Sequence, residues 1–284
     1  MAFNSWQELP YRAIYAVDTE FFGDEGNIKT PLCLVVRNLL SDTVDRYWQE
    51  DLHNMRKAPF DTGPEALFVA YYAPAELGVF KALGWPMPER IFDCYVEFVC
   101  ETNGQILSNG KKLLGAMSYF NIQSIGAEAK AGMYELILSG GPWDQKQKSD
   151  ILDYCQSDVD ALAQLFPSIV GKWINDELRL GQALLRGRYM AAVACMEHVG
   201  IPIDVPLLNK FWANWDHIKF KLIEKVDCAY GVYEEEKFKE GLFEEYLIRE
   251  GIPWPRLPSG KLALDRETFK TQKTTLNGGD KLYH

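Results

Sequence analysis

Short apolar runs with the pattern of β-strands occupy the first third of the chain. They predict strands at about 12–18, 32–38, 43–48, 67–72 and 91–93. The second and third runs flank the stretch L-L-S-D-T, which is typical of a hairpin turn. A sheet with at least one antiparallel pair is therefore expected near the N-terminus.

After the fourth run, apolar residues recur at the spacing of a helix. Leu77, Phe80 and Leu83 recur at that spacing between Pro74, which favours a helix start, and Gly84, which favours a helix end. Further helices are predicted through Glu97 and Val99 and at about 111–120, 146–166, 174–199, 205–227 and 234–250, the last a charged surface helix, with a loop-rich tail from 251. Strands followed by mixed elements predict an α/β fold with a mixed sheet flanked by helices.

The character of the chain changes near residue 172, where the mixture of strands and helices gives way to helices. We therefore expect two domains, residues 1–172 and a mainly helical region at 173–284. The start of the chain shows no signal-like segment, and no apolar run reaches the length of a membrane span. The six cysteines form no C-x-x-C pair and fit core thiols in a reducing cytosol. A soluble, cytoplasmic protein without a membrane partner is expected.

The net charge of −10 argues against a protein that binds nucleic acid through a basic surface alone. Most of the excess acid lies in residues 1–172. Such acidity fits a solvated surface, and it also fits a site for divalent metal ions, which would bring positive charge of their own. The net charge therefore argues more strongly against a protein that only binds DNA than against a metal-dependent nuclease.

Two carboxylates follow the first apolar run. Asp18 and Glu20 are two positions apart, so a strand would place both on one face. Buried together they would repel, and a divalent cation with its preference for oxygen ligands would remove the conflict. A solvated strand end is the structural alternative.

Three more residues extend this pattern. Tyr154 and Asp158 are four positions apart and share one face of the predicted helix at 146–166. Glu76 lies early in the helix that starts at Pro74. A buried tyrosine bonded to a carboxylate, and an acid that interacts with a helix dipole, are the structural alternatives for these residues.

The order of these motifs resembles the DEDD exonuclease family in its tyrosine variant. D-x-E on a first strand, an acid after a strand-to-helix turn and Y-x-x-x-D on a late helix are similar to the 3′–5′ exonuclease domain of family A DNA polymerases, including phage and plasmid forms. The resemblance covers about residues 10–170 and implies a ribonuclease-H-like fold. It is weaker at 188–205 (R-Y-M-A-A-V-A-C-M-E-H-V-G-I-P-I-D-V) and 257–268 (L-P-S-G-K-L-A-L-D-R-E-T), which are similar to the start and thumb region of the polymerase part.

Two departures from the family pattern matter. The family usually carries Asp within N-x-x-x-F-D, whereas Glu76 ends the stretch Tyr72-Ala73-Pro74-Ala75-Glu76 here. Glutamate reaches one methylene further and can still hold a metal ion or its water. The polymerase motifs that bind a nucleotide have no counterpart in this sequence, so we expect no DNA synthesis.

The resemblance implies hydrolysis of the 3′-terminal phosphodiester of DNA with two Mg²⁺ or Mn²⁺ ions. Asp18, Glu20 and Asp158 would hold one ion, Asp18 would bridge to the second, and Glu76 would help to hold that second ion. Tyr154 would orient the attacking water, because its ordinary pKa makes it a poor base at neutral pH.

The expected partner is DNA, most readily its single-stranded 3′ ends. The sequence predicts no particular protein partner. Candidate substrate-binding residues are Thr19, Phe21, Phe22, Lys111 and Lys112. The phenylalanines would stack on terminal bases, with core packing as the alternative, and the lysines would contact phosphate, with a solvated helix start as the alternative.

Two rival functions share these features. An exoribonuclease of the same fold, like the RNase D group, would use the same acids. A module that keeps the fold without catalysis would bind DNA but show no metal-dependent cleavage. The sequence argues against a P-loop enzyme, because no G-x-x-x-x-G-K-[ST] occurs. It also argues against a Cys or His hydrolase, because none of the histidines accompanies a plausible nucleophile.

Overall fold

The computed structural model describes residues 5–23, 28–122, 127–172 and 176–275 of the chain. Its contacts divide the chain into two compact units, Met1–Ile201 and Pro202–His284. The expected division at residue 172 falls earlier than this one, because helix α7 (Glu177–Val199) packs on the first unit.

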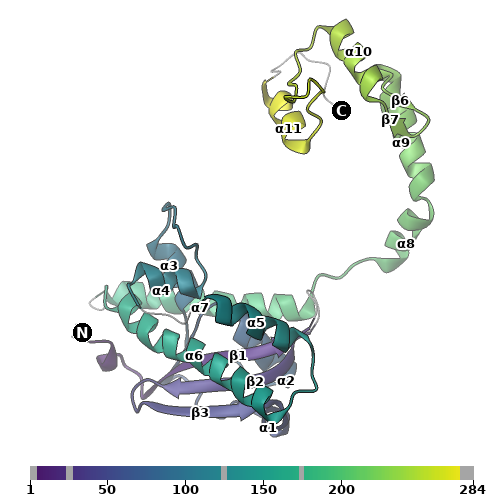
Figure 1. Cartoon of the computed structure of the whole chain (residues 1–284). Coiled ribbons are helices and arrows are strands. Elements are labelled where there is room, and N and C mark those ends of the chain that lie inside the picture. The colour runs from purple at the N-terminus through teal and green to yellow at the C-terminus, as the bar shows by residue number, and fades with distance from the viewer. Residues whose placement is uncertain (1–4, 24–27, 123–126, 173–175, 276–284) are drawn as a thin grey trace. The chain divides into compact units, whose positions relative to one another are not determined.

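The first unit is built on a five-stranded mixed sheet in the order β3-β2-β1-β4-β5 (Figure 1). β1 pairs antiparallel with β2 and β2 with β3, whereas β1–β4 and β4–β5 are parallel pairs. In numerical order the strands are Ala13–Phe22, Thr30–Asn38, Thr43–Trp48, Ala66–Ala70 and Ile91–Asp93. All five predicted strands and the predicted hairpin are confirmed.

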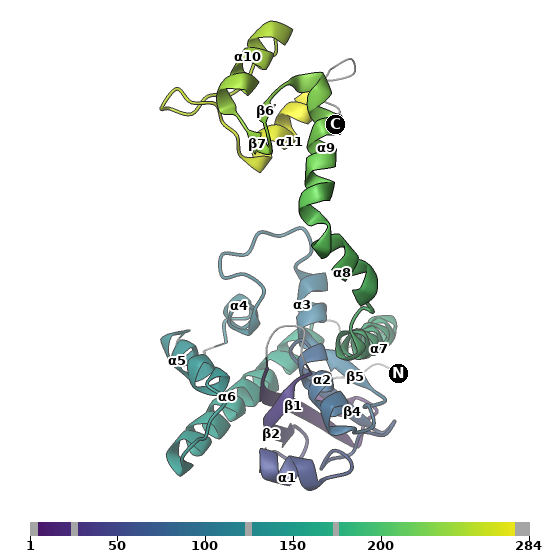
Figure 2. The same cartoon turned by 90° about the vertical axis from the view of Figure 1, so that its right-hand side faces the viewer.

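Helices cover both faces of the sheet, as the side view in Figure 2 shows. Helix α6 (Gln145–Val170) packs across β1 and β2 on one face, and α2 (Pro74–Leu83) and α7 pack together on the other. The alternation along β1 explains the two layers, because Ile14 and Ala16 belong to the core under α6 and Val17 to the core under α2 and α7. The predicted α/β class with a ribonuclease-H-like mixed sheet is confirmed.

Helix α7 is fixed to the first unit by two close contacts. A Cβ on Gly187 would lie 2.0 Å from the carbonyl oxygen of Ile91 in β5, so only glycine allows this approach. One residue earlier, Arg186 forms a two-pronged ion pair with the buried Glu97, with both N–O distances 2.7 Å. Glu97 lies in α3 (Cys94–Glu101), so α7 is held against both β5 and α3.

The remaining elements of the first unit are short. The 3₁₀ turn η1 spans Trp6–Glu8, α1 spans Gln49–Asn54, α4 spans Leu113–Tyr119 and α5 spans Ala127–Leu138. Helix α4 was predicted, whereas α1 and α5 were not. α6 begins with a capping box, in which the Asp144 side chain accepts from the Gln147 amide and the Gln147 side chain accepts from the Asp144 amide.

The second unit departs further from prediction. The helix expected at 205–227 is two helices, α8 (Val205–Ala213) and α9 (Trp215–Tyr230), which meet at Asn214. The helix expected at 234–250 was wrong over its first residues, where β6 (Tyr233–Glu234) and β7 (Lys237–Phe238) form a hairpin. Strands of two residues are too short to show an alternating pattern.

The helix that follows this hairpin is α10 (Glu240–Glu250), and it is not merely a surface helix. It buries Phe243, Tyr246 and Leu247 in the small core of this unit. The tail, expected to be loop-rich, contains helix α11 (Arg266–Thr275).

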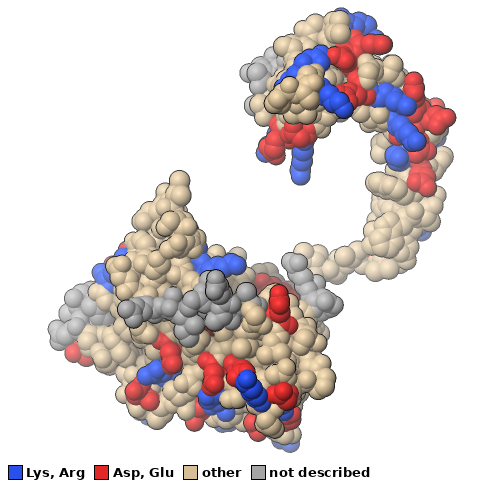
Figure 3. All heavy atoms as spheres, viewed as in Figure 1, with Lys and Arg blue, Asp and Glu red and all other residues tan. Residues whose placement is uncertain are grey.

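Charged side chains of both signs are interspersed on the α6 side of the sheet (Figure 3). Many of them form pairs between α6 and the strands beneath it, such as Arg37 with Asp160 and Arg46 with Asp153, both at 2.7 Å. The acidity of this face is thus partly balanced locally. Within the described ranges, no helix combines the length and apolar character that crossing a membrane requires.

Candidate active site

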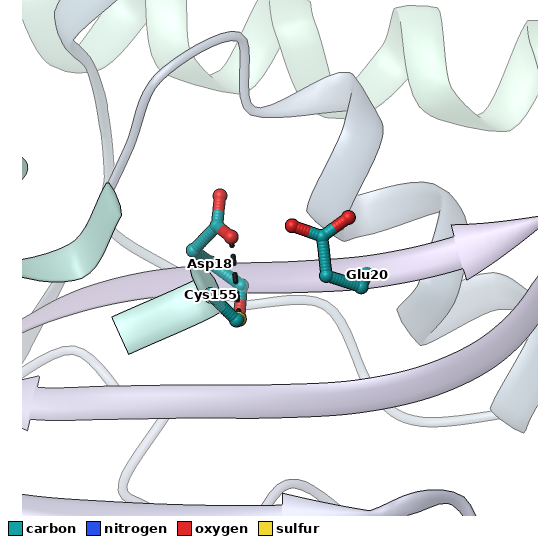
Figure 4. A group of neighbouring side chains, drawn as sticks. All are labelled: Asp18, Glu20 and Cys155. Atoms are coloured by element: carbon teal, nitrogen blue, oxygen red, sulfur yellow. Dashed lines mark hydrogen bonds between the residues drawn. The ribbon is translucent and has the colours of Figure 1, made fainter. Parts of the chain in front are cut away.

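Asp18 and Glu20 lie on β1 opposite Val35 and Cys33 of β2. Figure 4 shows both carboxylates extending to the same side of the strand, as their spacing predicted. The register of the β1–β2 pairing shifts directly after Glu20. Both acids therefore lie at the end of the regularly paired part of β1. Burial and then the charge of Asp18 raise the pKa of Glu20 well above its ordinary value.

Cys155 on α6 completes this corner of the site. Its Sγ lies 3.3 Å from Oδ2 of Asp18 and 3.4 Å from the Asp18 carbonyl oxygen (Figure 4). One donor atom each from Asp18, Glu20 and Cys155 falls within 4.8 Å of the others. Burial raises the pKa of the Cys155 thiol. The thiol therefore stays protonated and donates a hydrogen bond to Asp18.

Glu76 enters from the first turn of α2. Pro74 occupies an early position of this helix, where its missing N–H has no cost, and thereby places Glu76 within the first turn. The side chain is 3% exposed, and within the described part of the chain its Oε2 has no hydrogen-bond partner. Burial and then the charge of Asp18 raise the pKa of Glu76 well above its ordinary value.

Tyr154 and Asp158 lie one turn apart on α6, beside Cys155. Burial raises the pKa of Tyr154, and the charges of Asp158, Glu20 and Asp18 raise it further. The charges of Asp158 and Glu76 also act on Glu20. The four predicted acids and the tyrosine therefore share one electrostatic neighbourhood, although they come from β1, α2 and α6.

Lys29 is a neighbour of this site that the sequence did not reveal. Its ammonium donates to the carbonyl oxygens of Pro74 and Ala75, each at 3.0 Å, and lies 4.5 Å from the centre of the Phe21 ring. Burial lowers the pKa of Lys29, while the charge of Glu76 acts in the opposite direction. A lysine just before β2 carries no sequence signal for contact with a helix 45 residues away.

The candidate substrate-binding residues do not gather in one place. Thr19 is buried, and the alternation of β1 directs it to the face opposite Asp18 and Glu20. Phe21 contacts Lys29, whereas Phe22 packs on Trp143 with ring centres 5.8 Å apart, which is the core packing given as its alternative.

The two lysines lie around the start of α4. Lys111 is half-buried, and its carbonyl oxygen accepts from the Tyr71 hydroxyl. Lys112 is exposed and directly precedes α4. That position agrees with the solvated helix start given as its alternative.

The acids fit a divalent cation. Their donor atoms are carboxylate oxygens, the ligands that Mg²⁺ and Mn²⁺ prefer. Burial and then neighbouring negative charge raise the pKa of Glu20 and of Glu76, and the buried Oε2 of Glu76 has no hydrogen-bond partner among the described residues. A cation would satisfy that oxygen and remove the repulsion. The donor set therefore matches a hard metal ion.

No protein-family model and no curated protein sequence matches the chain. Solved structures do resemble it. One, described as the apo form of a nuclease, is 16% identical with a TM-score of 0.51, and the match covers 69% of this chain and 90% of that one. Another, the POL domain of Pol1 from M. smegmatis in complex with DNA primer-template and dNTP, is 11% identical with a TM-score of 0.54.

The match to the Pol1 domain covers 92% of this chain and 41% of that one, so the chain spans less than half of it. A third structure, Escherichia coli RNase D, described as an exoribonuclease involved in structured RNA processing, is 12% identical with a TM-score of 0.40 over 95% of this chain and 68% of that one. The first two likenesses show that the chain shares its fold with these proteins.

Proposed function

We propose that the chain is a metal-dependent 3′–5′ exonuclease that removes nucleoside monophosphates from single-stranded DNA ends. The proposal is supported by Asp18 and Glu20 on one face of β1, by the charges of Asp18, Asp158 and Glu76 that act on Glu20, and by a buried Glu76 oxygen that has no hydrogen-bond partner among the described residues. Buried carboxylates whose charges repel one another are costly to ionise unless a cation joins them. The fold shared with a solved nuclease agrees with this proposal.

The reaction is hydrolysis of the last phosphodiester. A water oxygen forms a bond to phosphorus, the bond from phosphorus to the 3′ oxygen breaks, and the proton of the water leaves for solvent as the 3′ oxygen takes one up. When bound, two divalent ions would supply charge to neutralise the phosphate and lower the pKa of the attacking water. Asp18, Glu20 and Asp158 would hold one ion, and Asp18 with Glu76 the other.

The residues of the chain contribute orientation. The raised pKa of Tyr154 keeps its phenol protonated, so it would position the water by a hydrogen bond rather than take its proton. Cys155 donates to Asp18 and thereby fixes the direction of that carboxylate. Lys29 holds the first turn of α2 through the Pro74 and Ala75 carbonyls and so holds the segment that carries Glu76.

A gel assay with a 5′-labelled DNA oligonucleotide tests the proposal. With Mg²⁺ or Mn²⁺ we expect a descending ladder with one-nucleotide steps, and with EDTA no cleavage. A matched RNA oligonucleotide is assayed in parallel. If the RNA is degraded faster than the DNA, RNA becomes the proposed substrate. Absence of cleavage of both with either ion would refute it.

Two substitutions on one helix sharpen the assay. Asp158→Asn should abolish cleavage while the protein stays folded. Asp160→Asn is the matched control, because Asp160 lies two residues away and pairs with Arg37 at the surface. Equal activity of the Asp158→Asn variant and the wild type would exclude Asp158 from the site.

A further inference from the structure

Tyr72 has a backbone conformation that tyrosine rarely adopts. Its φ is +67°, in the left-handed region, between the end of β4 and the start of α2. Glycine and asparagine enter this region more easily than a bulky residue does. The residue is also 40% exposed. Neither backbone preference nor core packing accounts for a tyrosine at this position.

A buried carboxylate holds the strained turn. Asp93, only 1% exposed, accepts from the amide of Tyr72 at 3.1 Å and from the amide of Ala73 at 2.8 Å. It also accepts from the amides of Tyr95 and Val96 at the start of α3. One side chain thus joins the turn before α2 to the first turn of α3. Strain maintained in this way is concentrated at functional sites in proteins.

Tyr72 precedes the first turn of α2, which carries Glu76. The Tyr72 ring packs on the half-buried ring of Tyr95, with centres 5.5 Å apart and planes at 85°. Its hydroxyl donates to Glu197 of α7 at 3.4 Å. The charges of Glu197 and Glu76 both act on Lys29, which contacts the first turn of α2. Tyr72 thus lies just before the helix turn that carries Glu76, and Lys29 bonds that same turn through the Pro74 and Ala75 carbonyls.

We propose that Tyr72, supported by Tyr95, stacks on a nucleobase of the substrate while the adjoining phosphodiester lies at the four acids. The inference rests on the proposed function and adds a base-binding surface to it. An exposed aromatic ring stacks on any base, which suits an enzyme that removes nucleotides in succession. Asp93 is a positioning residue in this account, since it holds the turn without touching the substrate.

The substitutions Tyr72→Phe, Tyr72→Leu and Tyr72→Gly separate stacking from structure. Phenylalanine keeps the ring, so KM for single-stranded DNA should stay within about 2-fold. Leucine and glycine should raise KM about 10-fold, as expected for one lost base stack, with kcat nearly unchanged. Glycine should also raise Tm, because it adopts positive φ without strain. A merely structural tyrosine would not produce higher stability together with weaker binding.

Binding without catalysis gives the second readout. Fluorescence anisotropy in EDTA measures the Kd of a labelled oligonucleotide, and a second oligonucleotide lacks the bases of its two 3′-terminal nucleotides. Wild type should bind the intact oligonucleotide about 10-fold more tightly than Tyr72→Leu does. With the abasic oligonucleotide this difference should disappear, because no base remains to stack.

The outcomes distinguish the inference from the function on which it rests. If wild type cleaves DNA and Tyr72→Leu changes neither KM nor Kd, the inference is wrong and the exonuclease stands. If the Tyr72→Leu effect persists on the abasic oligonucleotide, stacking is also wrong. If wild type cleaves nothing, the proposed function fails, and the binding experiment still decides whether Tyr72 contacts a base.

Discussion

The Cys155 thiol donates a hydrogen bond to the Asp18 carboxylate, with Sγ 3.3 Å from Oδ2. The contact joins α6 to β1 at the proposed metal ligand. Cys155→Ala removes this donor and leaves Asp18 freer to rotate, so we expect kcat to fall on the order of 10-fold. Cys155→Ser keeps a donor and should retain more of the activity. Steady-state cleavage of a DNA oligonucleotide measures both.

Cys228→Ala is the control for this pair, because Cys228 is exposed and lies in the second unit. It should leave kcat unchanged. Full activity in Cys155→Ala would show that the thiol does not position Asp18.

The stability of the metal-free protein should depend on pH through Glu20 and Glu76. The pKa of each is higher in the folded chain than its ordinary 4.5. Their contribution to stability is therefore complete below pH 4.5 and is lost as the pH rises through the folded-state pKa. Added Mg²⁺ should restore the loss, by about 2.7 kcal/mol at 100 times its Kd. Urea unfolding between pH 4.5 and 8, in EDTA and in Mg²⁺, tests this.

The matched variant is the double substitution Glu20→Gln and Glu76→Gln, which removes both titrating groups. Its unfolding free energy should vary less with pH and should not respond to Mg²⁺. The same pH slope and the same Mg²⁺ response as wild type would contradict the assignment.

Tyr154→Phe removes a hydroxyl that the proposal uses to orient water. We expect kcat to fall on the order of 10–1000-fold, as for lost positioning of a reactant, with little change in KM. The pKa of Tyr154 is raised above its ordinary value of 10, so the wild-type rate should show no loss from its ionisation below pH 10. A rate in Tyr154→Phe equal to wild type would remove this residue from the mechanism.

Gly187→Ala tests the close approach of α7 to β5. The added methyl would meet the Ile91 carbonyl oxygen at 2.0 Å, so we expect a loss of about 1–3 kcal/mol or more in unfolding free energy. Gly181→Ala on the same helix is the matched control, since apart from the backbone of its own helix turn no atom of the described residues lies within 4 Å of its added Cβ. Helix propensity predicts that it stabilises by about 1 kcal/mol. Equal effects of the two substitutions would contradict the packing of α7.

The parts of the fold that sequence predicted are those with local signals. Apolar runs of five or more residues located β1, β2 and β4, and Pro74 with Gly84 marked both ends of α2. The two-residue spacing of Asp18 and Glu20 sufficed to place them on one face. The strands β6 and β7 are too short for periodicity to show, and that is why a helix was expected in their place.

The contacts that complete the site are distant in sequence. Cys155 lies 137 residues from Asp18, and Asp93 lies 21 residues from Tyr72. The local sequence around a helical cysteine, or around an aspartate at the end of a short strand, is the same whether or not the side chain bonds to a residue far along the chain. Only the packing of α6 on β1, and the pairing of β5 with β4 that places Asp93 opposite Ala70, makes these contacts.

The central claim is that acids from β1, α2 and α6 hold divalent ions together. Anomalous diffraction from crystals soaked in Mn²⁺ measures this most directly. The account predicts peaks between the carboxylates of Asp18, Glu20, Asp158 and Glu76, and their absence in Asp158→Asn crystals soaked alike. If wild-type crystals soaked in millimolar Mn²⁺ show no anomalous peak at these carboxylates, the claim is contradicted.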